Sequence, residues 1–522
     1  MKKLVLTSLL ILCVLALGQA RELGLIPMPN SIRENAGKFN VGQELSLWIS
    51  SDVSDFNTQL LDSLLREDLK VGVDRAASFD VADISVALTP SLKREEYELT
   101  ITPQGVRLEG GSNTGVYYGL MTFSQIVASQ SDPRNISCVK ILDAPRYGYR
   151  ALMIDPARHF LPVDDVKRFV DLMSRFKYNV LQLHLTDDQG WRVEIKSHPE
   201  LTQSGDYYTQ EELKSLVAYA ADRNVEIVPE IDIPGHTAAF LYAHPELMCE
   251  HNDSLQIVLG KTVNLMLCAS KPEVYKIYDD IIAEIASVFP SKSIHLGGDE
   301  SAIDANWDKC SADSALVKSL GLDSSAELMA YFFNEIFNSV RKNGKRPMLW
   351  CELDNIYMPA TKYLFDYPQD VTLVTWRNGL TPKCIELTQQ SGNRLVMAPG
   401  EYAYLDYPQY KNDFPEYNNW GMPITTLEMV YDFDPSYGGE HPMIEGVMGT
   451  LWAEAIPDIN RLTYMAFPRA LALAEAGWCQ RERKDWISFK ERLIPVLSAM
   501  MQEGFSFRVP FEIYGKTRVK RK

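Results

Sequence analysis

The feature that most constrains the fold of this sequence is a repeating pattern that begins near residue 146. From there, short apolar runs alternate with longer amphipathic segments, which is typical of parallel strands joined by crossover helices. The expected strands are 149–154, 179–185, 225–230, 293–296, 347–350, 372–376, 395–398 and 447–452. Eight strands over roughly 300 residues predict an α/β fold, a (β/α)8 TIM barrel. A doubly wound open sheet is the alternative, but no glycine-rich phosphate turn follows the first strand.

The segment before the barrel, residues 21–145, has a different pattern. It contains a helical stretch at 116–127 and several short β-rich runs between turns. The expected strands here are 45–49, 84–88, 97–101 and 105–108. A sheet with helices on one face is the simplest assembly of these elements. Because carboxylates, histidines and glycines do not cluster in this segment, we interpret it as a smaller, supporting α+β domain.

The remaining boundaries follow from these two units. The barrel domain is expected over residues 146–505, and helices at 463–478 and 486–501 close it. Residues 506–522 are expected to form a C-terminal tail, with a frayed basic end.

The first twenty residues resemble a secretory signal peptide. Lys2 and Lys3 precede an apolar run, and Gly18 and Ala20 supply small residues at the −3 and −1 positions of a cleavage site. A membrane anchor is the alternative, but the run is shorter than the ~20 apolar residues of a spanning helix. We therefore expect an exported protein, periplasmic or secreted (lysosomal or extracellular in a eukaryote), without stable membrane insertion.

Charge and cysteine content limit the partners and cofactors. A formal net charge of −17 argues against nucleic acid and anionic membranes as partners. The cysteines after the signal segment are odd in number and widely scattered, without a C-x-x-C pair or zinc-type spacing. We therefore expect no metal site and no cofactor, and at least one free thiol. The oligomeric state is not indicated.

Acidic and aromatic residues follow most of the predicted barrel strands. This position matters because TIM barrels carry their active sites at the carboxyl ends of the strands. The residues are Asp155, Arg158, His159, Asp187, Asp188, Glu230, His236, Asp299, Glu300, Trp350, Trp376, Asp406, Trp452 and Glu454. Aromatic faces stack on the C–H face of a pyranose, and carboxylates accept hydrogen bonds from its hydroxyl groups. The predicted rim therefore suits a sugar.

Asp299 and Glu300 are the candidate catalytic pair. A general acid must be a carboxyl group that its surroundings keep protonated, and a neighbouring carboxylate raises its pKa. Consecutive residues of a strand point to opposite faces, so both carboxylates can face one site only where the strand bends. Gly297 and Gly298 permit such a bend. The structural alternative is a pair that caps the next helix.

The run HLGGDE at 295–300 is similar to the hallmark of family 20 glycoside hydrolases, the β-N-acetylhexosaminidases. Other motifs resemble the family in the same order: YR to RHF between 149 and 160, HLTDDQGWR at 184–192, and EIDIPGH at 230–236. IPMP at 26–29 and GVYYGL at 115–120 resemble its non-catalytic domain. The resemblance covers almost the entire chain after the signal segment.

This resemblance implies a reaction in which the substrate's own 2-acetamido group is the nucleophile. An oxazolinium intermediate forms and configuration is retained, unlike the usual pair in which a second carboxylate attacks the sugar. Glu300 is then the general acid and later the base, and Asp299 holds the acetamido N–H. Tyr404 is expected to donate to the acetamido carbonyl oxygen.

The resemblance also assigns the substrate-binding residues. Trp350, Trp376 and Trp452 wall the acetamido pocket or stack on the ring, and Arg150, Asp406 and Glu454 bind hydroxyl groups at the non-reducing end. A pocket closed around the terminal sugar implies exo-acting release of β-linked GlcNAc or GalNAc from a glycan or chitooligosaccharide.

His236 is expected beside Glu300, where it would tune protonation. Its partner is Asp187 or Asp188, and the sequence leaves this choice open. One departure from the family pattern is Cys351-Glu352, where the family commonly carries two acidic residues. This departure makes the role of Glu352 uncertain.

Two other classes remain as alternatives. A metal-dependent barrel hydrolase would use His184, Asp187 and His236, but the H-x-H pair typical after the first strand of such enzymes is missing. A sugar-binding protein without catalysis would keep the aromatic rim and lack the acid, whereas Glu300 is present.

Overall fold

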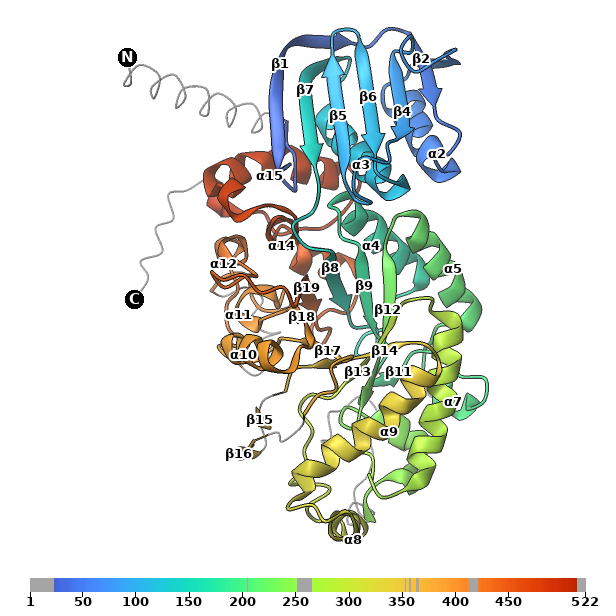
Figure 1. Ribbon diagram of the computed structural model, residues 1–522, viewed down its shortest axis with the longest axis vertical. Helices are drawn as coiled ribbons and strands as arrows, with labels where there is room; N and C mark the ends of the chain where they lie inside the picture. The colour runs from blue at the N-terminus through green and yellow to red at the C-terminus, as the bar shows by residue number, and fades with distance from the viewer. Residues whose placement is uncertain are drawn as a thin grey trace, which may run out of the picture.

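The computed structural model describes residues 23–203, 205–250, 265–352, 354–355, 358–362, 366–411, 413 and 421–513. It consists of a seven-stranded sheet followed by a closed eight-stranded barrel (Figure 1). The predicted signal segment and the basic end 516–522 lie outside the described residues. Within the described ranges, none of the helices combines the length and the apolar character needed to cross a membrane.

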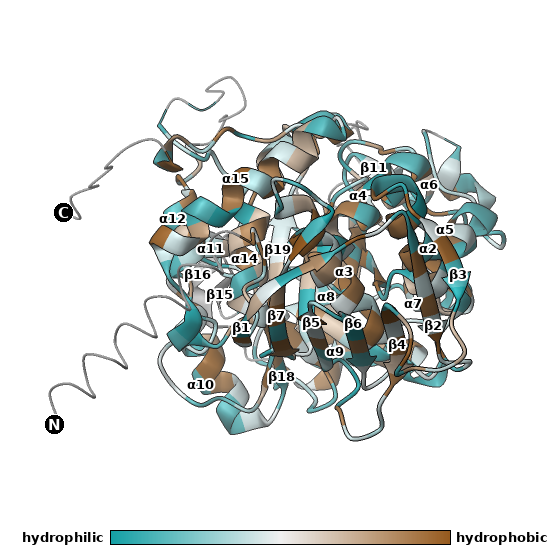
Figure 2. Ribbon diagram, turned by 90° about the horizontal axis from the view of Figure 1, so that it is seen from above, coloured by the Kyte–Doolittle hydropathy of each residue, from teal (hydrophilic) through white to brown (hydrophobic). Residues whose placement is uncertain are grey.

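The N-terminal sheet is mixed and has the strand order β1-β7-β5-β6-β4-β2-β3. Its strands are β1 (Ser31–Asn40), β2 (Glu44–Ile49), β3 (Gly72–Arg75), β4 (Ile84–Leu88), β5 (Tyr97–Thr102), β6 (Gly105–Gly110) and β7 (Asn135–Asp143). Helices α2 (Asp55–Ser63) and α3 (Asn113–Ser129) belong to the same domain, and α3 packs on β5 and β6. Hydrophobic residues recur along β5, β7 and α3 (Figure 2). The α+β prediction is confirmed, although β1, β3 and β7 were not predicted.

The barrel contains the eight predicted strands, all paired in parallel with their neighbours. They are β8 (Tyr149–Ile154), β9 (Val180–His184), β12 (Glu226–Ile233), β13 (Ser293–Gly297), β14 (Arg346–Trp350), β17 (Thr372–Val374), β18 (Arg394–Met397) and β19 (Ile444–Leu451). The predicted TIM barrel is therefore confirmed.

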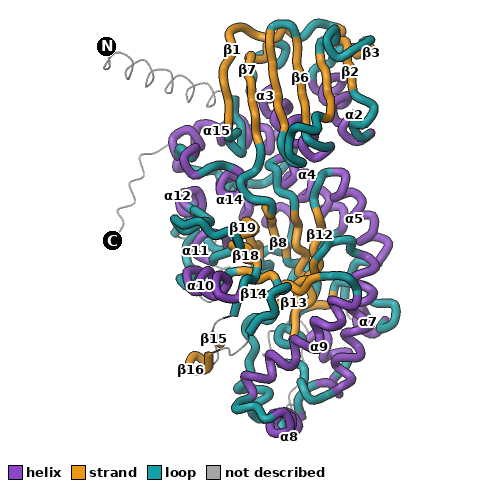
Figure 3. The backbone as a smooth tube through the Cα atoms, viewed as in Figure 1, coloured by secondary structure: helices purple, strands orange, loops and turns teal. Residues whose placement is uncertain are grey.

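Helices between the strands surround the barrel (Figure 3). The longer ones are α4 (Val163–Arg175), α5 (Gln210–Asp222), α7 (Pro272–Val288), α9 (Leu328–Lys342) and α10 (Thr381–Ser391). Shorter elements are the β10 (Thr186–Asp187) and β11 (Gly190–Trp191) hairpin, α6 (Ala238–Ala243), α8 (Ser311–Leu320), β15 (Asp354–Asn355), β16 (Met358–Lys362), α11 (Gly400–Ala403) and α12 (Leu427–Asp432). Thr209 and Glu212 form a capping box at the start of α5, which satisfies amide groups that the helix leaves unpaired.

The end of the chain differs from the prediction in two places. The helix expected at 463–478 is divided into α13 (Ile459–Ala466) and α14 (Arg469–Trp478), because Pro468 has no N–H for the helical ladder. After α15 (Trp486–Gln502), the expected tail is packed at its start. Arg508 is 2% exposed, and its Nε donates to Gln409 Oε1 at 3.0 Å. Residues up to 513 therefore belong to the barrel domain.

The N-terminal domain packs against the amino end of the first barrel strands. Tyr117 Oη donates to Ser174 Oγ at 2.9 Å, in the last turn of α4, and Lys177 Nζ donates to Asp143 Oδ2 at 3.2 Å. The opposite, carboxyl ends of the strands therefore point away from this domain (Figure 1), where a barrel active site is expected.

Candidate active site

Two glycines make the bend that presents the carboxylates. Gly297 and Gly298, at the end of β13, have φ angles of +65° and +94°, in the region that only glycine adopts without strain. A Cβ on Gly297 would lie 1.6 Å from Asp232 Oδ1. Glu300 itself has a φ of +47°, which is uncommon for a residue with a side chain. Since the next helix starts only at Ser311, the helix-capping alternative for the pair is wrong.

His236 lies beside this pair, as predicted. Its Nε2 is 3.6 Å from Glu300 Oε2, and its Nδ1 is 3.3 Å from Asp187 Oδ1. Asp188 instead accepts the backbone N–H of Ala238 at 3.0 Å, at the start of α6. The structure therefore gives Asp187 as the partner of His236.

The hydrogen-bonded chain continues below Asp187 into the barrel. His184 Nε2 lies 2.9 Å from Asp187 Oδ2, and His184 Nδ1 lies 3.1 Å from Glu230 Oε2. Glu230 also accepts Trp350 Nε1 at 2.9 Å and lies 3.0 Å from His295 Nδ1. Because these side chains are almost fully buried, their hydrogen bonds fix the orientation of the groups above them.

The two carboxylates have different affinities for protons. Burial raises the pKa of Asp299 to about 6; the charge of His236 opposes this rise and the charge of Glu300 adds to it. Burial also raises the pKa of Glu300, but the hydrogen bond and charge of His236, with the charge of Arg158, hold it below its ordinary value. In the unliganded site the proton therefore favours Asp299, the reverse of the sequence-based prediction. Because the Glu300 side chain is 33% exposed, a bound sugar would remove water from it and raise its pKa.

Arg158 is a site residue that the sequence placed on the predicted rim without giving it a role. It follows β8, and its Nη2 lies 2.9 Å from Asp187 Oδ2. Its Nη1 donates to Asp155 Oδ2 at 2.8 Å, and its Nε lies 3.6 Å from Glu454 Oε1. The guanidinium also lies over the Trp452 ring, 5.0 Å from the centroid. Its position after a barrel strand was a signal that could have identified it.

Arg150 lies elsewhere, so its predicted role in substrate binding is wrong. It is the second residue of β8, at the amino end of the barrel, and is 1% exposed. Its guanidinium donates to Lys177 O at 2.8 Å, Tyr147 O at 2.7 Å and Tyr118 Oη at 2.9 Å, and lies 3.0 Å from Glu95 Oε2. Arg150 therefore connects the two domains.

An aromatic wall lies at the carboxyl ends of the last strands. Its members are Trp376, Tyr404, Tyr407 and Trp452, and Met422 packs with them. The centroids of Tyr404 and Trp452 are 6.5 Å apart. Burial raises the pKa of Tyr404 well above its ordinary value, so its phenol stays protonated and is able to donate. Trp350 is 1% exposed, and its ring centroid lies 5.7 Å from that of Trp452. Trp350 therefore lies beneath this wall.

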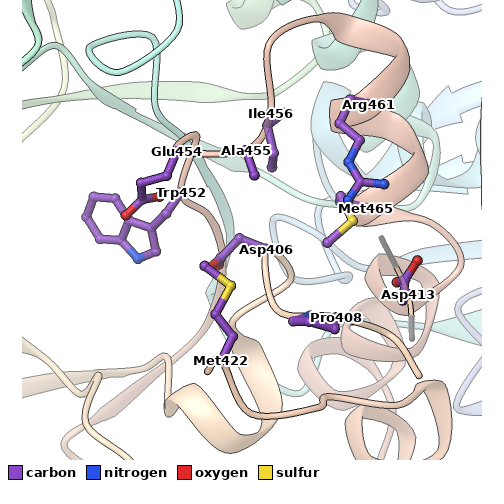
Figure 4. A pocket seen from close by; sticks show the side chains of 10 residues that line it. All are labelled: Asp406, Pro408, Asp413, Met422, Trp452, Glu454, Ala455, Ile456, Arg461 and Met465. Carbon is purple, nitrogen blue, oxygen red and sulfur yellow. The ribbon is translucent and has the colours of Figure 1, made fainter. Parts of the chain in front are cut away.

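Asp406 and Glu454 line a small pocket next to Trp452 (Figure 4). Its other lining residues are Pro408, Asp413, Met422, Ala455, Ile456, Arg461 and Met465. Burial and the charge of Glu454 raise the pKa of Asp406 well above its ordinary value. The Glu454 side chain remains 38% exposed. Both carboxyl groups are thus placed to accept hydrogen bonds from a polar ligand.

Glu352, whose role the sequence left uncertain, is 2% exposed and lies 3.4 Å from Arg377 Nη1. Burial and the charge of Asp299 raise its pKa well above the ordinary value. Its proximity to Asp299 makes it part of the acidic surroundings of the catalytic pair.

Cleavage of a glycosidic bond requires a proton donor, acceptors for the sugar hydroxyl groups and a flat apolar surface, all within one pocket. The rim of this barrel combines all three. Both ring nitrogens of His184 contact carboxylates, and His236 faces Glu300. These contacts favour protonated histidines beside the carboxylates. The fold and the site therefore define a glycoside hydrolase.

Comparison with known proteins gives the particular family. Residues 147–481 match the model of the glycosyl hydrolase family 20 catalytic domain, and residues 22–144 match domain 2 of the same family. The chain belongs to glycosyl hydrolase family 20.

Individual relatives agree with this assignment. A β-hexosaminidase of Akkermansia muciniphila is 40% identical over 428 residues, covering 77% of this chain and 83% of that protein. The exo β-N-acetylglucosaminidase of Vibrio harveyi in complex with N-acetylglucosamine superposes with a TM-score of 0.81 at 28% identity, covering 94% of this chain and 79% of that one. The N-acetyl-β-hexosaminidase of Streptomyces plicatus in complex with Thio-NAglucal gives 0.78 at 29% identity, covering 93% and 96%.

Proposed function

We propose that the protein is an exo-acting, retaining β-N-acetylhexosaminidase that releases terminal non-reducing β-linked GlcNAc or GalNAc from glycans. The observation that carries this proposal is the bend after β13, which presents Asp299 and Glu300 together beside His236. The names of the relatives, and the N-acetylglucosamine complex of one of them, support the same substrate class.

In the proposed first step, the acetamido carbonyl oxygen of the substrate attacks its own anomeric carbon. The bond from that carbon to the leaving oxygen breaks, and Glu300 transfers its proton to the leaving oxygen. Asp299 accepts the acetamido N–H and stabilises the positive charge of the oxazolinium, while Tyr404 donates to the acetamido oxygen.

In the second step, a water molecule attacks the anomeric carbon of the oxazolinium. Glu300, now ionised, takes a proton from this water, the ring of the intermediate opens, and the acetamido group is restored. Two displacements at the same carbon give net retention. Burial lowers the pKa of His236, but its contacts with Asp187 and Glu300 raise this pKa well above the ordinary value. The protonated His236 therefore stabilises the ionised form of Glu300 between the steps.

The proposed exo specificity follows from the pocket around Trp452. Arg158 is an N–H donor and Asp406 and Glu454 are acceptors, so together they suit the hydroxyl groups of a terminal sugar. Arg158 thereby takes the role that the sequence analysis gave to Arg150.

The acid assignment is tested with Glu300→Gln. We expect turnover of a natural glycoside, which has a poor leaving group, to fall by about 10²- to 10⁴-fold. Aryl glycosides with good leaving groups should lose less in the first step because they need less protonation, and substrate binding should remain. A near-normal rate on the natural glycoside would contradict the role of Glu300.

The participation of the substrate is tested with a thiazoline analogue of the oxazolinium. We expect strong competitive inhibition, because this analogue resembles the bicyclic intermediate. The matched control is the corresponding aryl β-glucoside with a 2-hydroxyl group, which should not be hydrolysed at a comparable rate. Weak inhibition by the thiazoline, or efficient hydrolysis of the glucoside, would indicate a nucleophile from the protein.

We also propose that the chain is exported and cleaved after Ala20, since the segment before it has the composition of a signal peptide. Expression in a host with a secretory pathway, followed by mass spectrometry of the N-terminal peptide, tests this. A mature protein that begins at Met1 would contradict it.

A further inference from the structure

Three cysteines and one aspartate meet below the carboxyl end of the barrel, outside the site described above. Cys249 follows the 3-10 turn Pro245–Leu247, Cys268 precedes α7, and Cys310 and Asp313 lie at the start of α8. All four side chains are 0% exposed. Their sulfur and carboxylate atoms all lie within 4.8 Å of one another.

Three distances between these atoms are close to the edges of a tetrahedral zinc site. Cys268 Sγ is 3.9 Å from Cys310 Sγ, and Asp313 Oδ2 is 3.3 Å from Cys249 Sγ and 3.5 Å from Cys268 Sγ. With a Zn–S distance of about 2.3 Å and a Zn–O distance of about 2.0 Å, tetrahedral geometry puts two sulfurs about 3.8 Å apart and sulfur and oxygen about 3.5 Å apart. A disulfide between Cys268 and Cys310 requires sulfurs about 2.05 Å apart, so these two thiols are not cross-linked.

The surroundings of the cluster suit anionic ligands. The backbone N–H of Ser270 donates to Asp313 Oδ1 at 2.8 Å, and Ser270 Oγ lies 3.2 Å from Cys268 Sγ. Cys310 is the N-cap residue of α8, where helix amides favour negative charge. The fully buried Asp313 carboxylate also lies within 3.3 Å of the thiols of Cys249 and Cys268. Since a buried carboxylate is costly without a compensating charge, a cation among these groups would stabilise them.

We propose that Cys249, Cys268, Cys310 and Asp313 bind a structural zinc ion. Three thiolates and one carboxylate complete a four-ligand shell without an open position, which is typical of structural zinc sites. Binding displaces the thiol protons to solvent, so affinity rises with pH. The soft sulfur ligands favour Zn²⁺ over Mg²⁺ or Ca²⁺.

The site would join three segments that are distant in the sequence. One of them runs from Glu300 to α8, and α8 lies at the end of the barrel domain farthest from the N-terminal sheet (Figure 1). The ion would therefore stabilise the loops around the catalytic carboxylates without contacting the substrate. The sequence predicted no metal site because the three cysteines lie too far apart for a zinc motif.

The test measures metal content and thermal stability of the full chain, purified without a metal-affinity step. We expect about one zinc ion per chain by mass spectrometry. Replacement by Co²⁺ should give the visible absorption of tetrahedral cobalt with thiolate ligands. Removal of the ion with a strong chelator should lower the Tm, and added Zn²⁺ should restore it.

Variants then identify the ligands. Cys310→Ser and Asp313→Ala should lower the zinc content and the Tm, whereas Cys310→His, which keeps a zinc ligand, should retain more of both. The matched control is Cys138→Ser, another buried cysteine in β7 of the N-terminal domain, which should keep its zinc. The wild-type measurements do not depend on whether these variants fold.

Two outcomes would overturn the proposal. A wild-type chain without zinc, in which peptide mapping finds a disulfide between two of the three cluster cysteines, would indicate that the cluster is oxidised instead of metal-bound. A chain without zinc in which all thiols are free, and which does not bind Co²⁺, would indicate simple packing of thiols. Neither result depends on the glycosidase activity.

Discussion

Asp299 and Glu300 are adjacent in the chain but face different electrostatic surroundings. Asp299 is nearly buried, with Glu300 and Glu230 nearby, so burial and like charges favour its neutral form. Glu300 is more exposed and lies near His236 and Arg158, which favour its ionised form. Because the proposed mechanism needs the proton on Glu300, substrate binding has to redistribute the proton within this pair. The pH dependence of kcat/KM should report the pair rather than either residue.

The raised pKa of Asp299 has a consequence for stability. An aspartate whose pKa is about 6 in the folded chain and about 3.9 in the unfolded chain stabilises the fold below about pH 4. This contribution is lost as the pH rises through about 6. We therefore predict that Asp299→Asn raises the free energy of unfolding at pH 7 by about 1–3 kcal/mol, although it lowers activity. Thermal unfolding of the variant and the wild type across this pH range checks the prediction.

A surface aspartate whose pKa is lowered, not raised, offers a control. The hydrogen bond with Arg341 lowers the pKa of Asp370, so this pair contributes stability above the unfolded pKa that is lost as the pH falls. Asp370→Asn should slightly lower the Tm at pH 7 and have no effect at acidic pH. If Asp299→Asn behaved in the same way as Asp370→Asn, the raised pKa of Asp299 would be wrong.

Strand ends account for most of what could be predicted about the site. The rule that barrel sites follow the strands identified Asp299, Glu300 and His236 from the sequence alone. The same rule points to Arg158 after β8 and not to Arg150, which is near the start of that strand. The role in substrate binding was predicted for Arg150 from the family resemblance, whereas the position relative to the strand end favours Arg158.

Other features depended on three-dimensional detail that the sequence does not carry. Asp187 and Asp188 are chemically equivalent neighbours, and only the β10–β11 hairpin decides which one faces His236. In the N-terminal sheet, the edge strand β1 carries several charged residues and was not predicted, because its exposed face hides the apolar pattern. Its pairing with β7 is a long-range contact.

The bend at the end of β13 gives a prediction at the level of the element. Gly297→Ala adds a methyl group only 1.6 Å from Asp232 Oδ1, on a backbone with a φ of +65°. We expect a loss of more than about 3 kcal/mol of stability or a displaced bend, with a kcat/KM lowered at least tenfold, since Asp299 and Glu300 follow directly. Chemical denaturation and steady-state kinetics measure the two effects.

Gly344 provides the matched control. It has a φ of +70°, and a Cβ at this position would meet nothing within 4 Å. Gly344→Ala should therefore cost only the backbone strain, about 1–2 kcal/mol, and leave kcat/KM unchanged. Equal effects of the two substitutions would show that the contact with Asp232 does not restrict residue 297.

In the whole molecule, the N-terminal domain contacts one end of the barrel, and the active site lies at the other end. Polar groups in this interface are buried and paired: Lys177 Nζ lies 3.2 Å from Asp143 Oδ2, 2.9 Å from Tyr97 Oη and 4.3 Å from the centroid of the Trp478 ring. Removing one partner from such a group leaves a desolvated charge. The N-terminal domain is therefore expected to stabilise the barrel without contacting the substrate.

Arg150, near the start of β8, and Arg158, just after its end, test this separation. Arg150→Met removes the guanidinium that contacts Tyr118 and Glu95, and we expect it to lower the stability by about 2–4 kcal/mol because Glu95 remains only partly exposed. Its KM and kcat at a temperature where it is folded should equal those of the wild type. Arg158→Met should instead lower kcat/KM by about 10- to 100-fold, since charged hydrogen bonds to the sugar are lost.

The comparison of these two variants discriminates between the two positions more sharply than either variant alone. Both substitutions remove one guanidinium that contacts a carboxylate, so a general effect of losing charge would appear in both. Activity is the deciding measurement, because only Arg158 lies within reach of Asp187 and Glu454 at the carboxyl end. A raised KM in Arg150→Met, measured on folded protein, would place a substrate contact at the amino end of the barrel and contradict the arrangement of the two ends. An unchanged KM together with a lower Tm would establish Arg150 as an interdomain residue.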